Sequence, residues 1–267
     1  MVKGLTQKEK ILARLEELGA AAKRSLGQNF LIESQIIEKI VEKAHSFNTS
    51  SLVEIGPGLG SLTEYLNKDQ LLLIELDTKF AQYWSGQGYK VIEADALKLD
   101  WKQLGLKDYT LVSNLPYQIS ARLVVEMSVT GGPSAMVLMF QKEVTDRILS
   151  APSSKDYGYL TVMAQSFWEI KRLCLVSASC FHPRPNVESA VLTFVDKAKD
   201  RTHAALFSEF VKLAFMERRK KLINKLKRHK HTVNWSQLLE ALGHNENVRA
   251  EELSVQDFQS LFESSLK

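Results

Sequence analysis

The feature that most constrains the fold is an alternation of short apolar runs with helical segments in the first two thirds of the chain. The run Leu71–Ile74 is continuously apolar, which is typical of a parallel strand buried on both faces. Segments 119–128 and 142–149 have helical spacing, and each follows an apolar run. This alternation predicts a doubly wound α/β fold, a parallel sheet with helices on both faces. The strands are predicted at 52–55, 71–74, 89–94, 110–113 and 135–140.

The alternation stops near residue 196. Two strands at 172–179 and 189–195, joined by a loop that contains two prolines, predict an antiparallel hairpin at the sheet edge. Residues 197–201 are charged and turn-like, and beyond them only helical periodicity remains. We therefore predict that the chain ends in helices only, at 207–215, 222–226, 235–242 and 255–261.

A boundary near residue 197 divides the chain into two predicted domains. The first, residues 1–196, holds the sheet and begins with a helical extension, residues 1–31. Within it, helical spacing predicts helices at 6–19 and around 36–41. The second domain, residues 197–267, is smaller and all-helical.

The positive charge of the chain is concentrated in one stretch. The net charge is +4, yet residues 212–231 alone carry +8, so the rest of the chain is mildly acidic. A basic patch of this density predicts binding to nucleic acid or to an anionic membrane, and the alternative is a solvated helix face. We interpret the stretch as one basic helix whose apolar side docks on the protein.

Composition excludes several classes of protein. Hydrophobic residues are 45% and charged residues 25% of the chain, which is typical of a globular protein and excludes a disordered tail or a collagen. Cys174 and Cys180 are too few for a disulfide framework and match no zinc motif, so we expect reduced thiols and no metal. No apolar run reaches the roughly 18 residues of a membrane span, and the charged N-terminus lacks the apolar core of a signal peptide. We therefore expect a cytoplasmic protein that does not associate with membranes.

A glycine turn at 56–60 gives the first sign of a ligand site. Its glycines allow close approach of the backbone, and the helix predicted to begin at 62–66 would offer free N–H groups. Glu75 ends the next predicted strand, 19 residues after Gly56, where an acid accepts hydrogen bonds from a ribose diol. Asp95 ends the third strand and can accept from an adenine amino group. Because the pattern is GxGxG rather than GxGxxG, we predict a nucleoside cofactor without phosphates, S-adenosylmethionine. The alternative is a glycine turn that binds nothing.

The sequence Asn114-Leu115-Pro116-Tyr117 directly follows the fourth predicted strand and is the predicted transfer site. Adenine N6 is a poor nucleophile because its lone pair is delocalised into the ring. The Asn114 side-chain oxygen and the Leu115 carbonyl can accept its hydrogens and favour a more pyramidal nitrogen, while Pro116 fixes the turn. Tyr117 can stack on the base, and Phe181 is a candidate for the opposite aromatic wall. The alternatives are a proline turn with a core tyrosine, and Phe181 as a core residue.

Together these motifs resemble those of the bacterial small-subunit ribosomal RNA adenine dimethyltransferases, the family linked to kasugamycin sensitivity. The resemblance covers nearly the whole chain, with no departure at the key positions. It implies a Rossmann-like class I S-adenosylmethionine-dependent methyltransferase sheet. It also implies cofactor contacts at Asn29, Leu31, Gly56, Glu75, Asp95 and Asn114, of which the first two are not derivable from the residues alone. The motifs are KRSLGQNFL, VEIGPGLGSLTEYL, IELD, EADAL, SNLPY, FQKEV, FHPRPNVESAV and FMERRKKLINKL.

The resemblance also implies a substrate and a reaction. The reaction would transfer two methyl groups to N6 of each of two adjacent adenosines in a hairpin near the 3′ end of small-subunit (16S) rRNA. The partner would be this rRNA within the assembling 30S subunit, so the enzyme would take part in rRNA processing and ribosome biogenesis. We expect a monomer, and neither a metal nor a covalent nucleophile is implied. RNA binding is expected from the helical domain, at Arg218, Arg219, Lys220 and Lys221.

Two other functions compete with this interpretation. A related enzyme could methylate a large-subunit adenosine and confer macrolide resistance, but the long helical C-terminus and FMERRKKLINKL favour the small-subunit enzyme. A non-catalytic assembly or transcription factor could use the same fold. Intact Asn114, Pro116 and Tyr117, with Glu75 and Asp95, favour an active enzyme.

Overall fold

The computed structural model describes residues 5–19, 28–217, 220–230 and 232–266. The chain forms two compact units, each assembled from separate parts of the sequence. The first unit contains Met1–Leu123, Gly132–Thr145 and Ile170–Asp196. The second contains Val124–Gly131, Asp146–Glu169 and Lys197–Lys267.

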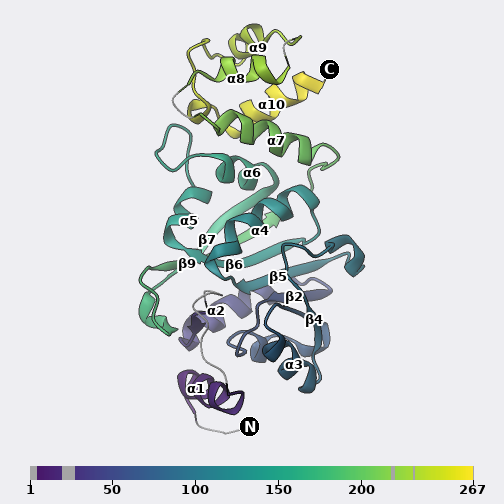
Figure 1. Cartoon of the computed structure of the whole chain (residues 1–267), viewed down its shortest axis with the longest axis vertical. Coiled ribbons are helices and arrows are strands. Elements are labelled where there is room, and N and C mark those ends of the chain that lie inside the picture. The colour runs from purple at the N-terminus through teal and green to yellow at the C-terminus, as the bar shows by residue number, and fades with distance from the viewer. Residues whose placement is uncertain (1–4, 20–27, 218–219, 231, 267) are drawn as a thin grey trace. The chain divides into compact units, whose positions relative to one another are not determined.

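A seven-stranded sheet forms the centre of the first unit (Figure 1). Strand β2 pairs in parallel with β3 and β5, β3 with β4, and β5 with β6, while β9 is antiparallel to β6. The predicted strands are therefore confirmed, and the two strands predicted at 172–179 and 189–195 are neighbours at one end of the sheet, where β9 adds antiparallel to β6. Their order is β4 (Lys90–Glu93), β3 (Leu71–Glu75), β2 (Ser51–Ile55), β5 (Tyr109–Asn114), β6 (Ala135–Gln141), β9 (Ser189–Asp196) and β7 (Trp168–Val176).

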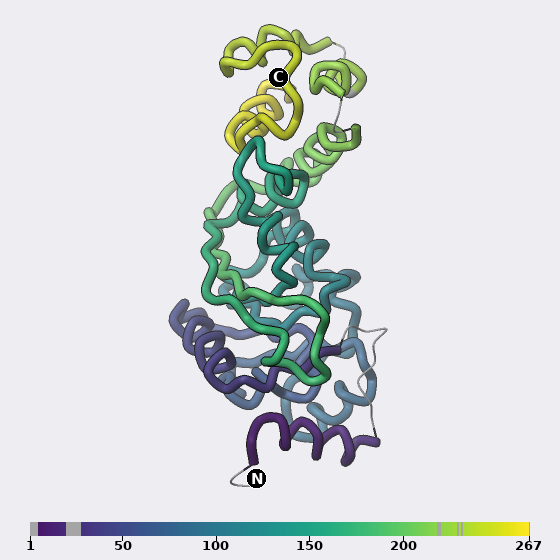
Figure 2. Tube along the Cα trace, turned by 90° about the vertical axis from the view of Figure 1, so that its left-hand side faces the viewer, coloured from purple at the N-terminus to yellow at the C-terminus, as the bar shows by residue number. Residues whose placement is uncertain are grey.

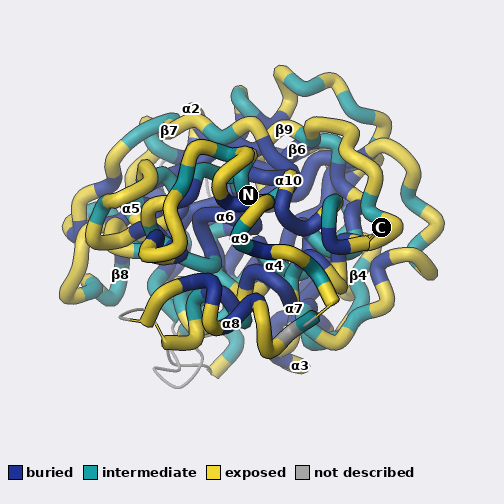
Figure 3. The backbone as a smooth tube through the Cα atoms, turned by 90° about the horizontal axis from the view of Figure 1, so that it is seen from above, coloured by how far each residue is buried: buried dark blue, intermediate teal, exposed yellow. Residues whose placement is uncertain are grey.

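Helices cover this sheet with their apolar sides. Helix α2 (Ser34–His45) contacts β5 and β6, and α3 (Thr78–Gly86) contacts β3 and β4. Strands β6 and β9 are buried along almost their whole length, and buried residues are drawn dark blue in Figure 3. The predicted helices at 119–128 and 142–149 are α4 (Tyr117–Thr130) and α5 (Lys142–Ile148). Burial of side chains such as Ile37 and Val137 in one cluster holds helix and sheet together.

The helix predicted to begin at 62–66 is absent among the described residues, and this prediction is wrong. The chain instead forms two 3-10 turns, η2 (Thr63–Tyr65) and η3 (Lys68–Gln70). Leu62 and Leu66 are both buried, and directly afterwards the Asn67 side chain accepts from the Asp69 amide and starts the second turn. The chain therefore turns back toward β3 before a full α-helix can form, and the glycine loop is not followed by the N-terminus of an α-helix.

A small strand pair lies outside the main sheet. Strand β1 (Phe30–Leu31) is antiparallel to β8 (Phe181–His182), with Leu31 opposite Phe181. The sequence did not predict this pair, because strands of two residues have no detectable periodicity. It joins the segment around Asn29 to the loop between β7 and β9.

The second unit is built from helices. Its helices are α6 (Tyr159–Phe167), α7 (Ala204–Phe215), α8 (Leu222–His229), α9 (Trp235–Ala241) and α10 (Val255–Leu266), and the last four are drawn in green to yellow in Figure 2. Aromatic rings form much of its core, where Phe210 contacts both Trp235 and Phe262. The four helices predicted after residue 197 are confirmed. No described helix is both long enough and apolar enough to cross a membrane.

Helix α1 (Gln7–Glu17) confirms the helix predicted at 6–19, and it belongs to the first unit. Thr6 begins it with a capping box, in which its hydroxyl accepts from the Glu9 amide and the Glu9 carboxylate accepts from the Thr6 amide. Its Ile11 side chain is fully buried in a cluster with Phe30, Leu59 and Phe80.

Candidate active site

A cleft opens where the parallel strands β2, β3 and β5 end, at their carboxyl ends. Ligands bind at this edge in open α/β sheets because the loops leaving parallel strands converge there. The cleft encloses about 1030 Å³ of empty space, part of it open to solvent. It is lined by residues from five segments, namely 28–30, 54–62, 74–76, 94–96 and 114–119.

The charge of the cleft has one sign. Three carboxylic acids line it, Glu54, Glu75 and Asp95, and its described lining includes no lysine, arginine or histidine. A phosphate-bearing cofactor would meet three acids and no cation there. A cofactor with a positive centre and a nucleoside fits this lining instead.

The glycine loop adopts the conformation that its glycines allow. Gly56 and Gly58 have φ values of 65° and 51°, which L side chains rarely adopt. A Cβ atom on Gly58 would also lie 3.1 Å from the Phe30 ring. The Gly58 amide donates to the Glu75 carboxylate at 3.1 Å, so the loop is joined to the next strand.

Glu75 is held in place by backbone amides. Its two carboxylate oxygens accept from the Gly58 and Asp77 amides, at 3.1 and 2.8 Å. Burial raises the pKa of Glu75, and these amides oppose the rise because they stabilise the charged form. Each oxygen keeps a second lone pair, so the side chain can still accept from a ribose diol. Asp95 also lines the cleft, and one of its oxygens accepts from the Leu97 amide at 3.0 Å.

Glu54 is a cleft residue that the sequence reasoning missed. It is 2% exposed, and its Oε2 is buried and has no hydrogen-bond partner in the described part of the chain. Burial raises the pKa of Glu54 to about 8, and the charge of Glu75 adds to the rise. The Thr63 hydroxyl has a smaller effect that lowers the pKa of Glu54. An acid in the otherwise apolar strand 52–55 is the signal that marks this residue.

Asn114 is fixed by the segment that contains Asn29. Its side-chain Nδ2 donates to the Asn29 carbonyl at 2.9 Å. Because a carbonyl can only accept, this bond sets the orientation of the amide and leaves Oδ1 as the acceptor on a cleft-lining side chain. The Ser113 hydroxyl donates to the Ile55 carbonyl at 2.5 Å and so ties the end of β5 to β2.

The rest of the predicted transfer site also lines the cleft. Leu115, Pro116 and Tyr117 lie there together with Asn114, at the start of α4. The Tyr117 hydroxyl is 2.8 Å from the Ser189 hydroxyl, which tethers the ring to β9. Burial raises the pKa of Tyr117, so the phenol stays neutral near pH 7.

Two predicted site residues are placed differently from the others. Leu31 has a fully buried side chain in the core, and Phe181 is 3% exposed in the same cluster. Neither belongs to the residues that line the cleft, and the two are opposite each other in the β1–β8 pair. The structure therefore does not place the Phe181 ring as an aromatic wall. Asn29, Gly56, Glu75, Asp95 and Asn114 are brought together as expected.

The basic stretch 212–231 is not one helix, and that interpretation is wrong. Helix α7 ends at Phe215 and α8 begins at Leu222. The buried stripe of α7 runs from Ala204 to Ala214 and stops before the charged residues 217–221. A new helix allows Leu222, Ile223 and Leu226 to be buried instead.

The predicted RNA-binding residues lie in and beside this break. Arg218 and Arg219 are outside the described residues. Lys220 and Lys221 are exposed, and Lys220 contacts the Glu217 carboxylate at 2.8 Å. Lys225 is different, because it is 2% exposed and donates to the Ala214 carbonyl at 2.6 Å, at the end of α7.

The family of the chain follows from comparison with known proteins. A family model described as ribosomal RNA adenine dimethylase matches residues 19–267. The chain belongs to this family. It is 43% identical over 267 residues to the Ribosomal RNA small subunit methyltransferase A of Bdellovibrio bacteriovorus, covering 96% of each chain. The corresponding protein of Nitrosospira multiformis is 38% identical over 249 residues, which are 90% of this chain and 94% of the relative.

Solved structures agree with this assignment. A dimethyladenosine transferase from Plasmodium falciparum has a TM-score of 0.68 and 25% identity, and the match covers 87% of this chain and 95% of that one. The 23S rRNA methyltransferase ErmE has a TM-score of 0.65, and the match covers 90% of this chain and 100% of that one. Its sequence identity of 23% shows a shared fold alone. The predicted resemblance and the methyltransferase sheet are confirmed, and the chain is an rRNA adenine dimethyltransferase that uses S-adenosylmethionine.

The cleft residues fit S-adenosylmethionine. The unpartnered Glu54 Oε2 and the absence of basic side chains from the described lining suit a cofactor that carries a positive sulfonium centre. Glu75 would hold the ribose and Asp95 the adenine amino group. The cofactor supplies an electrophilic methyl group, so the protein has to bind, orient and exclude water.

Proposed function

We propose that this enzyme acts on small-subunit rRNA and transfers two methyl groups to N6 of each of two adjacent adenosines. The target is a hairpin near the 3′ end of 16S rRNA in the assembling 30S subunit. The relatives from Bdellovibrio bacteriovorus and Nitrosospira multiformis, which carry small-subunit names, support this target. Its place of action is then the cytoplasm, where ribosomes assemble, and we propose that it acts as a monomer.

One observation carries the proposed chemistry, the hydrogen bond from Asn114 Nδ2 to the Asn29 carbonyl. It leaves Asn114 Oδ1 as an acceptor for one hydrogen of an adenine N6, and we propose that the carbonyl of Leu115, which also lines the cleft, accepts the other. Binding those hydrogens reduces delocalisation of the nitrogen lone pair into the ring and makes N6 a better nucleophile. The acceptors are fixed before substrate arrives, so little reorganisation is needed during transfer.

The remaining site residues have supporting roles in this proposal. Pro116 sets the turn that aims the acceptors, and Tyr117 stacks on an adenine taken out of the RNA hairpin. Phe181 acts through the strand pair, because its partner Leu31 is two residues from Asn29. Cofactor contacts are proposed at Asn29, Leu31, Gly56, Glu75, Asp95 and Asn114.

RNA binding is proposed for the basic stretch. Lys220 and Lys221 are exposed, and with Arg218 and Arg219 they would contact phosphates of the rRNA. Residues 1–196 would then serve as the methyltransferase domain and 197–267 as the RNA-contacting domain. The exposed side chains, rather than a continuous basic helix, support this role.

A labelling experiment tests the proposed target. The full chain is incubated with methyl-deuterated S-adenosylmethionine and unmethylated small subunits, with large subunits and free rRNA in parallel reactions. Nucleoside mass spectrometry is expected to find labelled N6,N6-dimethyladenosine in 16S rRNA, and mass spectrometry of nuclease fragments is expected to map it to two adjacent positions. Product on large-subunit RNA alone would support the competing enzyme. Binding to small subunits without any product would support a non-catalytic assembly factor.

A further inference from the structure

Helix α1 is docked against the glycine loop rather than extending from the molecule. Its Ile11 side chain is 0% exposed and packs with Leu59 of the loop, with Phe30 beside the cleft and with Phe80 of α3. The family-model match begins at residue 19, after α1 has ended.

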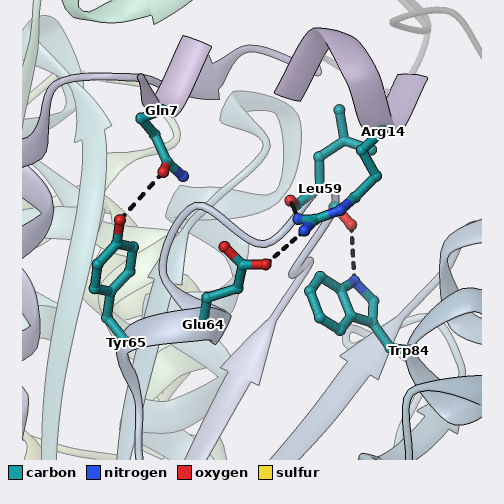
Figure 4. Close-up of polar contacts among 7 residues, drawn as sticks. Gln7, Arg14, Leu59, Glu64, Tyr65 and Trp84 are labelled. Carbon is teal, nitrogen blue, oxygen red and sulfur yellow. Dashed lines mark hydrogen bonds and ion pairs between the residues drawn. The ribbon is translucent and has the colours of Figure 1, made fainter. Parts of the chain in front are cut away.

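Arg14 is the residue of α1 that reaches the loop backbone (Figure 4). Its guanidinium donates to the Leu59 carbonyl and forms an ion pair with Glu64 at 2.5 Å. The same group lies over the rings of Trp84 and Tyr83, 5.3 and 5.4 Å from their centroids. The Arg14 side chain is 13% exposed, so these contacts are largely shielded from water.

The loop is therefore held from outside at two consecutive carbonyls. Arg14 binds the Leu59 carbonyl, and the Trp84 indole N–H donates to the Gly58 carbonyl at 2.9 Å. A Cβ atom on Gly60 would lie 2.5 Å from the Trp84 ring and 2.9 Å from Arg14 Nη1, so the clamp also requires glycine at this position.

These outer contacts determine what the loop presents to the cleft. In a planar peptide unit the carbonyl and the following N–H point in opposite directions. With the Leu59 carbonyl bound by Arg14, the Gly60 amide points the other way and closes the turn on the Pro57 carbonyl at 2.8 Å. The Gly58 amide then donates to Glu75, the proposed ribose acceptor.

We infer that Arg14 is a positioning residue for cofactor binding: through the Leu59 carbonyl it holds the glycine loop in the shape that binds S-adenosylmethionine. The inference rests on the proposed placement of the cofactor in the cleft. A second contact keeps α1 in register, because the Tyr65 hydroxyl donates to the Gln7 side-chain oxygen at 3.2 Å (Figure 4). Without Arg14 the loop would populate other conformations besides the one that binds the cofactor. The affinity for the cofactor would then be lower, although the groups that touch the substrate would be unchanged.

Isothermal titration of the full chain with S-adenosylhomocysteine tests this inference. Arg14→Met removes the donors and the charge while keeping most of the apolar length, and it is expected to raise the Kd about tenfold. Arg14→Lys keeps the charge but loses the planar group that donates and stacks at once, so about a threefold rise is expected. Lys8→Met is the matched control, because it removes a charge from an exposed position of the same helix, and its Kd should equal that of wild type.

A methylation assay separates positioning from a general loss of stability. Arg14→Met should raise the KM for S-adenosylmethionine about tenfold and leave kcat at saturating cofactor within twofold of wild type. A variant with a lowered Tm and an unchanged Kd would overturn the inference, because Arg14 would then only stabilise the fold. If Arg14→Met does not fold, an unchanged Kd in Arg14→Lys overturns it equally. Failure of the wild type to bind S-adenosylhomocysteine would instead overturn the proposed cofactor site.

Discussion

The cofactor cleft and the basic stretch use charge in opposite ways. In the cleft, Glu54 and Glu75 are buried acids held inside the first unit. In the basic stretch, Lys220 and Lys221 are exposed at a break between two helices of the second unit. Acids buried around a cleft act on one ligand at short range, whereas exposed lysines act on many phosphates through a field that salt screens. The two regions should therefore respond differently to mutation, pH and salt.

The largest effect is expected in the cleft, at Asn114. Asn114→Ala removes one fixed acceptor, so we expect turnover to fall by about 10²-fold or more, in line with the loss of one preorganised contact in other enzymes. Cofactor affinity should stay within roughly tenfold, because Glu75 and Asp95 remain. Single-turnover methylation and S-adenosylhomocysteine titration measure the two quantities. Asn247→Ala, at an exposed position of the second unit, is the control. Turnover like that of wild type would refute the role of Asn114.

The next effect concerns the pH dependence of stability, through Glu54. The pKa of Glu54 is about 8 in the folded protein, so the folded state keeps a proton that the unfolded chain loses above its ordinary pKa near 4.5. The contribution of protonated Glu54 to the free energy of unfolding is therefore complete below about pH 4.5. It is lost as the pH rises toward 8. Glu54→Gln is neutral throughout and should escape this loss.

Chemical denaturation without cofactor at pH 5 and pH 8 measures this difference. Between these values the variant should gain about 2 kcal/mol relative to wild type, at roughly 1.4 kcal/mol for each pH unit of unequal protonation and with allowance for water in the open cleft. Glu16→Gln removes the same charge from an exposed position of α1 and should show no such gain. If the free energy of unfolding changes with pH in the same way for wild type and Glu54→Gln, the raised pKa assigned to Glu54 is contradicted.

The basic stretch should show a smaller, salt-dependent effect. Changing Arg218, Arg219, Lys220 and Lys221 together to Gln should weaken binding to the rRNA hairpin about tenfold at moderate salt. Because each phosphate contact releases counterions, the slope of log affinity against log salt should also become shallower by about 1 to 3. Fluorescence anisotropy across a salt series measures both. A control variant neutralises exposed lysines of the first unit, namely Lys39, Lys79, Lys90 and Lys102. An unchanged slope in the first variant would place the RNA surface elsewhere.

The smallest effect is expected at Tyr117. Tyr117→Phe keeps the stacking ring and removes the hydroxyl that contacts Ser189, so turnover should fall only about threefold. Ser189→Ala should reproduce this loss, and Tyr117→Ala should exceed it because the ring itself is removed. A loss in Tyr117→Phe as large as in Tyr117→Ala would show that the hydroxyl, not the ring, carries the role.

The sequence predicted those parts of the site that depend on local patterns. Glu75 and Asn114 end the apolar strands β3 and β5, and Asp95 closely follows β4. Parallel strands bring their carboxyl ends to one edge, so the meeting of these three residues was predictable. The β1–β8 pair was not, because its strands are two residues long and about 150 residues apart in the sequence. Phe181 belongs to that pair and is buried in the core cluster, outside the residues that line the cleft.

Most other differences between the sequence predictions and the structure also depend on tertiary contacts rather than on local sequence patterns. Glu54 was missed because a strand pattern shows which positions are buried but not that one buried acid lines a cleft. The helix expected at 62–66 failed because the requirement to return to β3 outweighed local spacing. The break between α7 and α8 agrees with the separate helices that apolar spacing predicts at 207–215 and 222–226, whereas the count of charges over 212–231 suggested one helix. Arg14 could not be found from sequence because its partner is the backbone carbonyl of Leu59.

The salt dependence of the two ligands on the same protein tests the central contrast most directly. Kd values are measured for S-adenosylmethionine and for the 16S rRNA hairpin across one salt series. The contrast between a buried acidic cleft and an exposed basic surface predicts a slope of about −1 or shallower for the cofactor and about −3 or steeper for the RNA. Equal slopes for the two ligands would contradict it, because both would then be bound by the same kind of exposed charge.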